Sequence, residues 1–579
     1  MSRRTFVKGV IATGVVASLP PSVRAENPII SQQVHQTLKG TEFHLSIDKT
    51  AVNITGTPSV ATTVNGMLAG PTLRWKEGET VTIHVTNNLD EATSIHWHGI
   101  ILPAEMDGVP GISFDGIAPG ETFTYTFPII QSGTYWYHSH SGFQEQTGIY
   151  GAIVIDPKDR MPYEYDKEYV ITLSDWSDEQ PASIYRKLKL SADYYNFKQR
   201  TVGDFFAEVK KKGFFSAFND RKMWNSMRMS DRDLSDVTGY TYTFLMNGLN
   251  PATNYKTLFS KGDKVLLRFI NSAAMTFFDV RIPGLKMRVV AADGNNVQPV
   301  SVDEFRIGVA ETYDVIVEPE EEHAYAIFAQ SIDRSGYALG SLTYDYGVEA
   351  TPPTMDPLPI LTHTDMGMNM ASMGDSKHHM PAMKGMTKMS MDQAPMGHDM
   401  AAMNKRTIPV TPLKTASGVQ TTMRGMDPQY RLDDPGVGLR DNGRKVLTYA
   451  DLKSLCSTKY DRYPDREIVL RLTGSMERYM WSINGIKYED ADPLVFHYGE
   501  RLRITYINDT MMNHPMHLHG MWSDLETGDD DFLPKKHTII VQPGAKISFR
   551  VNVDARGSWA YHCHLLYHMT DMFRKVVVA

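Results

Sequence analysis

The chain has 579 residues, which is too long for a single hydrophobic core, so three or four domains are expected. Hydrophobic residues make up 42% of it and charged residues 22%, as in ordinary globular proteins. The formal net charge of -8 argues against nucleic acid as a partner, because phosphate binding needs a basic surface.

The N-terminus has the pattern of an export signal. Arg3 and Arg4 precede an apolar run of small residues to about Leu19, and Ala25 ends a suitable cleavage site. This predicts a twin-arginine signal peptide over residues 1–25 and a periplasmic location; the alternative is a short amphipathic or anchor helix. The run is too short to cross a bilayer, and no other stretch reaches the roughly 18 to 20 apolar residues of a membrane span.

Short runs with strand-like alternation fill most of the chain after the signal peptide. Residues 80–85 and 122–127 are examples, and Gly, Pro and Asn separate such runs. This texture is typical of an antiparallel sandwich or barrel. We therefore predict an all-β fold with three domains, at residues 26–157, 158–350 and 441–579.

Two segments depart from this texture. Residues 183–236 are rich in Lys, Phe, Met and Asp with helical patterning, which predicts a helical insertion near the start of the second domain. Residues 351–440 form a Met-rich segment, with 12 Met between Met366 and Met403. Because it offers no periodic apolar face, we predict a flexible loop before the third domain.

The first and third predicted domains share an internal repeat. Residues 95–99 match 516–520, and residues 133–140 match 557–564. Two copies of one sandwich indicate duplication of a single metal-binding fold. The repeated clusters hold ten of the 20 histidines: His96, His98, His138, His140, His514, His517, His519, His562, His564 and His568.

The spacing of these histidines predicts two metal sites. Residues two apart on a strand project from one face, so the four His-x-His pairs can meet where the first and third domains face each other. Cys563, between His562 and His564, points the other way, where His514 and His568 can converge on it. Two imidazoles and a thiolate, with a Met nearby, are the ligand set of a blue-copper site. Electrons would have a short covalent route from Cys563 to the outer cluster.

These motifs resemble those of the multicopper oxidases, and the resemblance covers nearly the whole chain after the signal peptide. It implies three cupredoxin-like Greek-key domains and four copper ions. By this resemblance His514, Cys563 and His568 bind the type 1 copper, and His96 and His517 bind the type 2 copper. The type 3 pair is assigned to the remaining six histidines: His98, His138, His140, His519, His562 and His564.

The axial position departs from the family pattern. Members usually place this residue five positions after the last type 1 histidine, which here is Phe573, whereas Met572 is four positions after it. Against the first domain, a single deletion brings Met572 opposite Ile149, in the axial place. We predict Met572 as a weak axial ligand; with Phe573 there instead, the site would be three-coordinate.

The repeat also predicts that only one blue copper is present. Thr93, Ser139 and Gln144 lie opposite the three type 1 ligands of the third domain, so the first domain lacks them. The second predicted domain has no His-x-His pair and should be structural.

Asp107 lies eleven residues after His96 and matches an acidic residue that relays protons near the type 2 copper in similar oxidases. The alternative is a turn residue before Gly108. With Cys563 a ligand, Cys456 is left as an inert thiol or a weak extra copper site, and no disulfide is expected.

Within the family, the twin-arginine start, the Met-rich segment and the 562–568 motif most resemble periplasmic copper-resistance proteins. This implies a laccase-like oxidoreductase that oxidises Cu(I) with dioxygen, with periplasmic copper-binding proteins as candidate partners. The Met-rich segment would capture additional copper through its soft thioethers, or is a linker whose composition is incidental. The alternatives are a laccase acting on small phenols and a copper-sequestering protein with incidental oxidase activity.

Overall fold

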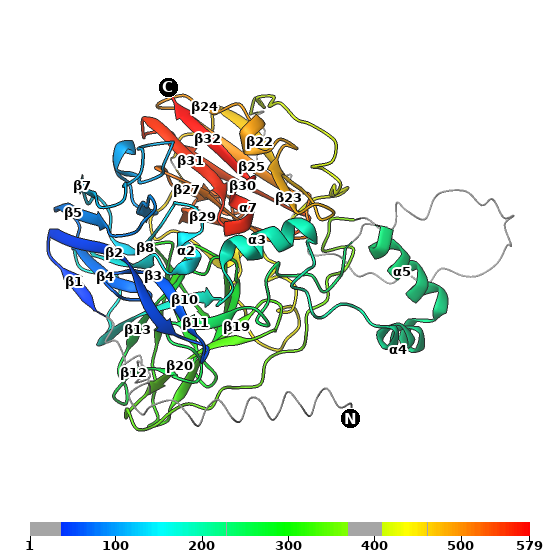
Figure 1. Cartoon of the computed structure of the whole chain (residues 1–579), viewed down its shortest axis with the longest axis horizontal. Helices are drawn as coiled ribbons and strands as arrows, with labels where there is room; N and C mark the ends of the chain where they lie inside the picture. The colour runs from blue at the N-terminus through cyan, green and yellow to red at the C-terminus, as the bar shows by residue number, and fades with distance from the viewer. Residues whose placement is uncertain (1–35, 227–228, 369–407, 460) are drawn as a thin grey trace, which may run out of the picture.

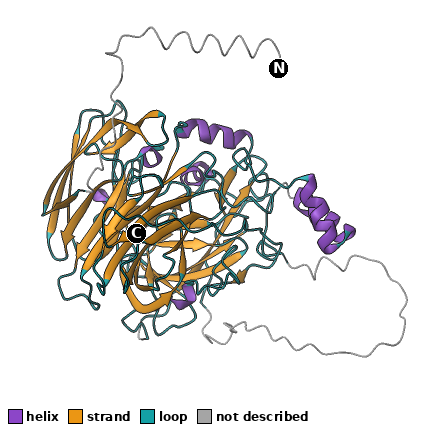
Figure 2. Ribbon diagram, turned by 90° about the horizontal axis from the view of Figure 1, so that it is seen from below, coloured by secondary structure: helices purple, strands orange, loops and turns teal. Residues whose placement is uncertain are grey.

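The computed structural model describes residues 36–226, 229–368, 408–459 and 461–579. Figures 1 and 2 show that strands far outnumber helices in this part, which confirms the all-β prediction. The predicted signal peptide (residues 1–25) and the Met-rich residues 369–407 lie outside the described residues. Within the described ranges, no helix combines the length and apolar character that crossing a bilayer requires.

The first domain contains two sheets, with strand orders β1-β4-β9-β8-β6 and β3-β2-β5-β7. Its elements are β1 (Thr37–Lys39), β2 (Glu42–Asn53), β3 (Pro58–Val64), β4 (Gly70–Lys76), β5 (Thr80–Asn87), β6 (His96–His98), η2 (Ala104–Met106), β7 (Thr122–Pro128), β8 (Gly133–His138), α2 (Gln144–Thr147) and β9 (Tyr150–Asp156).

The second domain contains the sheets β11-β10-β13-β18-β15-β16 and β12-β20-β19-β14-β17. Its strands are β10 (Lys167–Trp176), β11 (Thr243–Met246), β12 (Tyr255–Leu258), β13 (Val265–Asn271), β14 (Phe278–Arg281), β15 (Met287–Ala292), β16 (Asn295–Val302), β17 (Glu304–Ile307), β18 (Thr312–Val317), β19 (Tyr325–Ser331) and β20 (Tyr337–Thr343). Its helices are α3 (Pro181–Leu190), α4 (Val202–Lys212) and α5 (Phe214–Ser226).

The third domain contains the sheets β23-β22-β25-β30-β27-β28, with β21 paired to β30, and β24-β32-β31-β26-β29. Its elements are β21 (Gln429–Tyr430), η4 (Tyr449–Asp451), β22 (Arg466–Ser475), β23 (Met480–Ile483), η5 (Tyr488–Asp490), β24 (Leu494–Phe496), β25 (Arg501–Asn508), β26 (His514–Leu518), β27 (Ser523–Leu525), β28 (Lys535–Lys536), β29 (Thr538–Val541), β30 (Ala545–Asn552), β31 (Gly557–Cys563), α7 (Leu566–Met569) and β32 (Phe573–Val578).

All three domains repeat one topology. The order β4-β9-β8-β6 of the first domain corresponds to β12-β20-β19-β14 in the second and to β24-β32-β31-β26 in the third. In each copy the first two strands run parallel and the others antiparallel. The sequence indicated an antiparallel sandwich or barrel and did not predict these parallel pairs. They arise because the chain crosses to the other sheet before it returns.

Burial along the strands follows their surroundings. In β5 the buried Val81, Ile83 and Val85 alternate with more exposed polar residues, as expected for one solvent-facing side. In β13, by contrast, every residue is buried. Its Arg268 donates to Thr134 Oγ1 of β8 at 3.0 Å, so the first domain covers its outer face.

The predicted helical insertion is confirmed and has two parts. Helix α3 lies against the third domain, where Lys189 Nζ is 2.9 Å from Asp571 Oδ2. Helices α4 and α5 project away from the body of the molecule (Figure 1). Thr201 and Asp204 form a capping box that begins α4.

The described ends of the Met-rich segment are packed rather than free. The Asp427 amide donates to Gly367 O at 2.8 Å, and Arg440 Nη1 lies 2.6 Å from Asp365 Oδ1. Gln429 in β21 pairs with β30 of the third domain. Residues on both sides of 369–407 therefore belong to the folded body.

A buried charge cluster joins the second and third domains. Lys536 Nζ of β28 is 3.0 Å from Asp293 Oδ2 and 3.0 Å from Glu311 Oε1, and all three side chains are almost completely buried. Asp293 lies in the turn between β15 and β16, and Glu311 directly precedes β18. The ammonium group therefore compensates two carboxylates of another domain.

Replacing this ammonium group should loosen the contact between the two domains. Lys536→Met is expected to lower the free energy of unfolding by about 3–5 kcal/mol, because it leaves two buried carboxylates uncompensated. Denaturant unfolding monitored by tryptophan fluorescence measures the change. The control is Lys535→Met, at the exposed neighbouring position; equal losses in the two variants would contradict the assignment.

Candidate metal centre

The last His-x-His motif lies where two strands and a short helix meet. Cys563 ends β31, His514 begins β26 and His568 lies in α7, and all three side chains are fully buried. Cys563 Sγ is 3.5 Å from His514 Nδ1 and 3.9 Å from His568 Nδ1, and the two Nδ1 atoms are 3.3 Å apart. Two imidazole nitrogens and one sulfur converging in this way fit a blue-copper site.

Each imidazole of this group is held through its other nitrogen. His514 Nε2 donates to Thr510 Oγ1 at 2.7 Å, and His568 Nε2 donates to Asp236 Oδ2 at 2.6 Å. Both Nδ1 atoms are thereby left to face the sulfur. Asp236 belongs to the second domain, and the sequence analysis missed it because 332 residues separate it from His568.

Strand register separates the two candidates for the axial place. His562 lies opposite Phe573, and the Cys563 amide donates to Met572 O at 3.0 Å. Because opposite residues share a face of the sheet, Met572 lies on the Cys563 side and is fully buried. The Phe573 ring instead stacks on His562, with centroids 5.5 Å apart. The register thus favours Met572, which stays the predicted axial residue.

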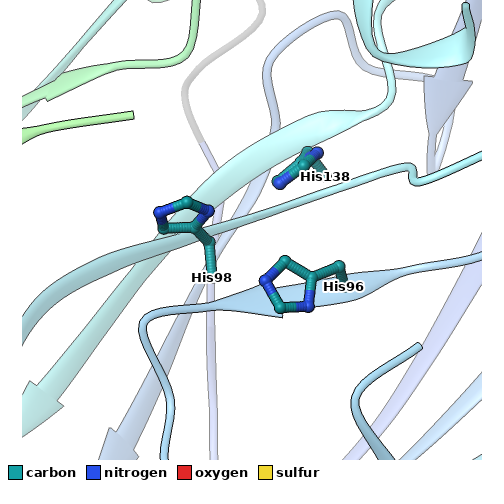
Figure 3. Close-up of side chains that lie close together, drawn as sticks. All are labelled: His96, His98 and His138. Atoms are coloured by element: carbon teal, nitrogen blue, oxygen red, sulfur yellow. The ribbon is translucent and has the colours of Figure 1, made fainter. Parts of the chain in front are cut away.

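The other motif histidines gather between the first and third domains. His96 lies opposite His138 where β6 pairs with β8, and His517 lies opposite His562 where β26 pairs with β31. Figure 3 shows His96, His98 and His138 close together on neighbouring strands. Three close contacts between Nε2 atoms are His140–His562 at 3.2 Å, His519–His562 at 3.0 Å and His138–His564 at 3.3 Å.

In most of these imidazoles one nitrogen is hydrogen-bonded to an oxygen atom of the protein, and the other nitrogen faces the cluster. The held nitrogens are His96 Nδ1 on Asp107 O (2.7 Å), His517 Nδ1 on His537 O (2.7 Å), His562 Nδ1 on Cys563 O (3.0 Å), His138 Nδ1 on Ser139 O (3.0 Å), His519 Nδ1 on Asp107 Oδ2 (2.9 Å) and His98 Nε2 on Thr538 Oγ1 (3.2 Å). The opposite nitrogens of His96, His98 and His517 are buried with no partner among the described residues. Since buried polar atoms are nearly always bonded, these orphaned nitrogens fit metal ligation.

Burial keeps the imidazoles in the form that binds metal. Burial, with a smaller contribution from neighbouring imidazoles, lowers the pKa of His98 and His140 well below the ordinary 6.5, and that of His562 to about 3. Neutral imidazole is the ligating form. Burial also raises the pKa of the Cys563 thiol, so its thiolate requires a nearby cation. The donor sets of both clusters therefore fit copper.

Asp107 is buried and contacts two of the predicted ligands. Its Oδ2 is 2.9 Å from His519 Nδ1, and its Oδ1 is 3.2 Å from His96 Nδ1. Gly108 follows with φ of +79°, and a Cβ there would lie 1.8 Å from Ile95 O, so the turn requires glycine. Asp107 thus combines the turn position with contacts to the cluster; its relay role stays a prediction.

The first domain contains a polar cluster where the third has its type 1 residues. Gln144 Oε1 accepts hydrogen bonds from Thr93 Oγ1 at 2.7 Å and from Ser139 Oγ at 3.0 Å. These are the three residues that the sequence repeat aligned with His514, Cys563 and His568. A hydrogen-bonded amide and two hydroxyls occupy the space, with no thiolate and no imidazole among them.

Two buried side chains beside the cluster were not predicted from the motifs. Glu145 Oε2 lies 2.9 Å from His138 Nδ1, and the centroids of the His537 and His98 rings are 4.8 Å apart. Neither belongs to a His-x-His pair, so spacing alone gave no signal. Of the two cysteines, Cys456 is exposed and Cys563 is buried, and both are free thiols.

Sequence comparison agrees with this geometry. Three family models described as multicopper oxidase match residues 46–160, 167–347 and 461–579. The chain belongs to the multicopper oxidase family. Membership makes it an oxidoreductase with copper as cofactor.

Relatives of this multicopper oxidase include copper-resistance proteins. It is 55% identical to copper resistance protein A of Escherichia coli, over 100% of this chain and 99% of that protein. It is 30% identical to multicopper oxidase MmcO of Mycobacterium tuberculosis, over 89% and 82% of the two chains. The crystal structure of Fet3p, a multicopper oxidase that functions in iron import, superposes with a TM-score of 0.63 at 19% identity, over 93% and 90% of the chains, which shows the shared fold.

The two axial candidates can be separated by their effect on reduction potential. Met572→Leu is expected to raise the potential of the type 1 copper, because losing a weak thioether donor favours Cu(I). Redox titration of the visible thiolate-to-copper band measures the shift. Phe573→Leu serves as the control and should leave the potential unchanged, since Phe573 faces His562; the opposite pattern would exclude Met572.

Proposed function

We propose that this multicopper oxidase takes electrons one at a time from Cu(I) and uses four of them to reduce dioxygen to water. The observation that supports this most is the position of Cys563. Its Sγ belongs to one buried donor cluster, while the adjacent His562 and His564 contribute imidazoles to the other. Copper bound at both clusters would supply one-electron redox chemistry and dioxygen reduction.

In this proposal the donor residues divide into three sets. The type 1 set is His514, Cys563 and His568 with Met572 as axial ligand, and the type 2 set is His96 and His517. The type 3 set is His98, His138, His140, His519, His562 and His564. Asp107 orients His519 through its carboxylate and His96 through its main-chain carbonyl, and it is the proposed proton relay.

A cavity whose lining includes methionines and carboxylates supports Cu(I) as the substrate. It has a volume of about 650 Å³, and Met229, Met476 and Asp233 are among the residues that line it. Asp236, three residues after Asp233, accepts from His568 and also from Tyr479 OH at 2.9 Å. Thioethers are soft ligands that suit Cu(I), and carboxylates attract a cation.

The cellular role follows from the relatives and from the N-terminus. Relatives named copper resistance protein A and the predicted twin-arginine signal together support a periplasmic protein of copper resistance. Oxidising Cu(I) to the less permeant Cu(II) would protect the cell. The Met-rich residues would bind additional copper, and periplasmic copper-binding proteins are candidate partners.

Two alternative functions would have a different substrate or no physiological substrate. A laccase would oxidise phenols as its physiological substrates, and a sequestering protein would store copper with incidental turnover. The complete donor set of the interdomain cluster argues against storage alone, because storage does not require eight converging imidazoles.

Dioxygen uptake by copper-loaded protein supplied with Cu(I) is the first test. We expect one dioxygen consumed per four Cu(I), and an intense visible band that disappears together with the uptake in Cys563→Ser. A visible band without dioxygen uptake would refute the oxidase and support sequestration.

The cavity proposal predicts a substrate-specific defect. Met229→Leu combined with Met476→Leu should raise KM for Cu(I) by about tenfold or more, because two soft ligands are lost. Oxidation of a phenol should keep its rate. Steady-state kinetics with both substrates measures this, and Met287→Leu, in the core of the second domain, is the control. A defect confined to the phenol would favour the laccase.

A further inference from the structure

One buried carboxyl group lies behind two imidazoles that come from different domains. Glu145, in α2, is 2% exposed; its Oε2 is 2.9 Å from His138 Nδ1 and its Oε1 is 4.0 Å from His564 Nδ1. His138 and His564 face each other through their Nε2 atoms at 3.3 Å. The carboxyl group therefore lies near the Nδ1 atoms of two imidazoles whose Nε2 atoms face each other.

The contact between Glu145 and His564 joins two atoms that have no hydrogen-bond partner in the described part of the chain. Glu145 Oε1 and His564 Nδ1 are both buried without a hydrogen-bond partner among the described residues. When a histidine ligates through Nε2, its Nδ1 carries the proton and donates it to a neighbouring acceptor. A small movement of either side chain would close the 4.0 Å gap to a hydrogen bond.

Helix α2 fixes the carboxyl group between the domains. Its first residue, Gln144, fills the polar cluster of the first domain described above. Gln146 Oε1 accepts from Tyr242 OH of the second domain at 3.0 Å and from Tyr567 OH of the third at 2.6 Å. Glu145, between these two anchors, has little freedom to turn away.

We propose that Glu145 is a positioning residue for the type 3 pair. Its Oε2 lies beside His138 Nδ1, which also donates to Ser139 O at 3.0 Å, and its Oε1 would accept from His564 Nδ1. One side chain would thereby hold an imidazole from each domain toward the same metal ion. The inference rests on the four-copper centre proposed above. In the repeat, Met569 lies opposite Glu145, so the third domain has no equivalent carboxylate at this position.

The test replaces Glu145 by the residue found at the equivalent place. Glu145→Met in the full chain, loaded with copper, should weaken retention of the type 3 copper against a chelator by about 10–100-fold. Copper that is silent in electron paramagnetic resonance in the wild type, because the pair is coupled, should be lost or become visible. The visible type 1 band should remain, which shows that the protein is folded.

A conservative variant and a matched control complete the experiment. Glu145→Gln keeps one oxygen acceptor, enough for one imidazole, so its loss should be intermediate, near the lower end of the 10–100-fold range. Asp175→Asn alters a buried carboxyl group whose oxygens accept from the Ala274 and Met275 amides and from the Thr276 hydroxyl, and it should behave as wild type.

Three outcomes would overturn the inference. The first is full retention of the silent copper pair in Glu145→Met, and the second is an equal loss in Asp175→Asn. The third applies if Glu145→Met lacks the type 1 band and therefore does not fold. In that case, retention of the type 3 copper by Glu145→Gln at the wild-type level would overturn the inference. A wild type without a silent copper pair would instead refute the four-copper proposal, and this inference with it.

Discussion

The alternation of side chains along β31 is the constraint on which the rest of the centre depends. His562 and His564 face the first domain, whereas Cys563 between them faces the core of its own domain. One strand therefore belongs to both clusters, and covalent geometry sets the distance between them. The first domain has to present its own imidazoles at the same face, and it does so with the same pairing: His96 lies opposite His138 as His517 lies opposite His562.

The second domain has no His-x-His pair, yet two of its carboxylates form hydrogen bonds that fix the position of histidines in both clusters, either directly or through a neighbouring residue. Asp236 accepts from His568, a predicted type 1 ligand, and Asp293 accepts from the amides of His537 and Thr538 at 3.1 Å each. Thr538 in turn contacts His98, and the His537 carbonyl holds His517. Burying such carboxylates is costly unless they are bonded, so each contact also restricts how the domains can shift. The domain that lacks donor residues thus keeps the donors in place.

The donor residues could be predicted from the sequence because a strand of period two converts a local motif into a shared face. The helical insertion and the three β domains follow from local patterns in the same way. The residues that orient the donors could not be predicted so, since Asp236 and His568 meet across 332 positions, and Asp107 and His519 across 412. The choice between Met572 and Phe573 needed the strand register, and the parallel strand pairs needed the path of the chain between sheets.

The first and third domains differ at one cluster, and that difference determines from which domain electrons would enter the imidazole cluster in the proposed function. Thr93, Ser139 and Gln144 satisfy one another by hydrogen bonds, so these three residues of the first copy offer two hydroxyls and an amide in place of a thiolate and two imidazoles. In the proposed centre, the covalent route from a thiolate into the imidazole cluster therefore starts in the third domain, at Cys563. Beside this thiolate lies His568, whose Nε2 is hydrogen-bonded to Asp236 at the end of the insertion. In the proposed function, an electron donor would therefore approach the thiolate group at the insertion of the second domain, where Asp236 also holds His568 in place.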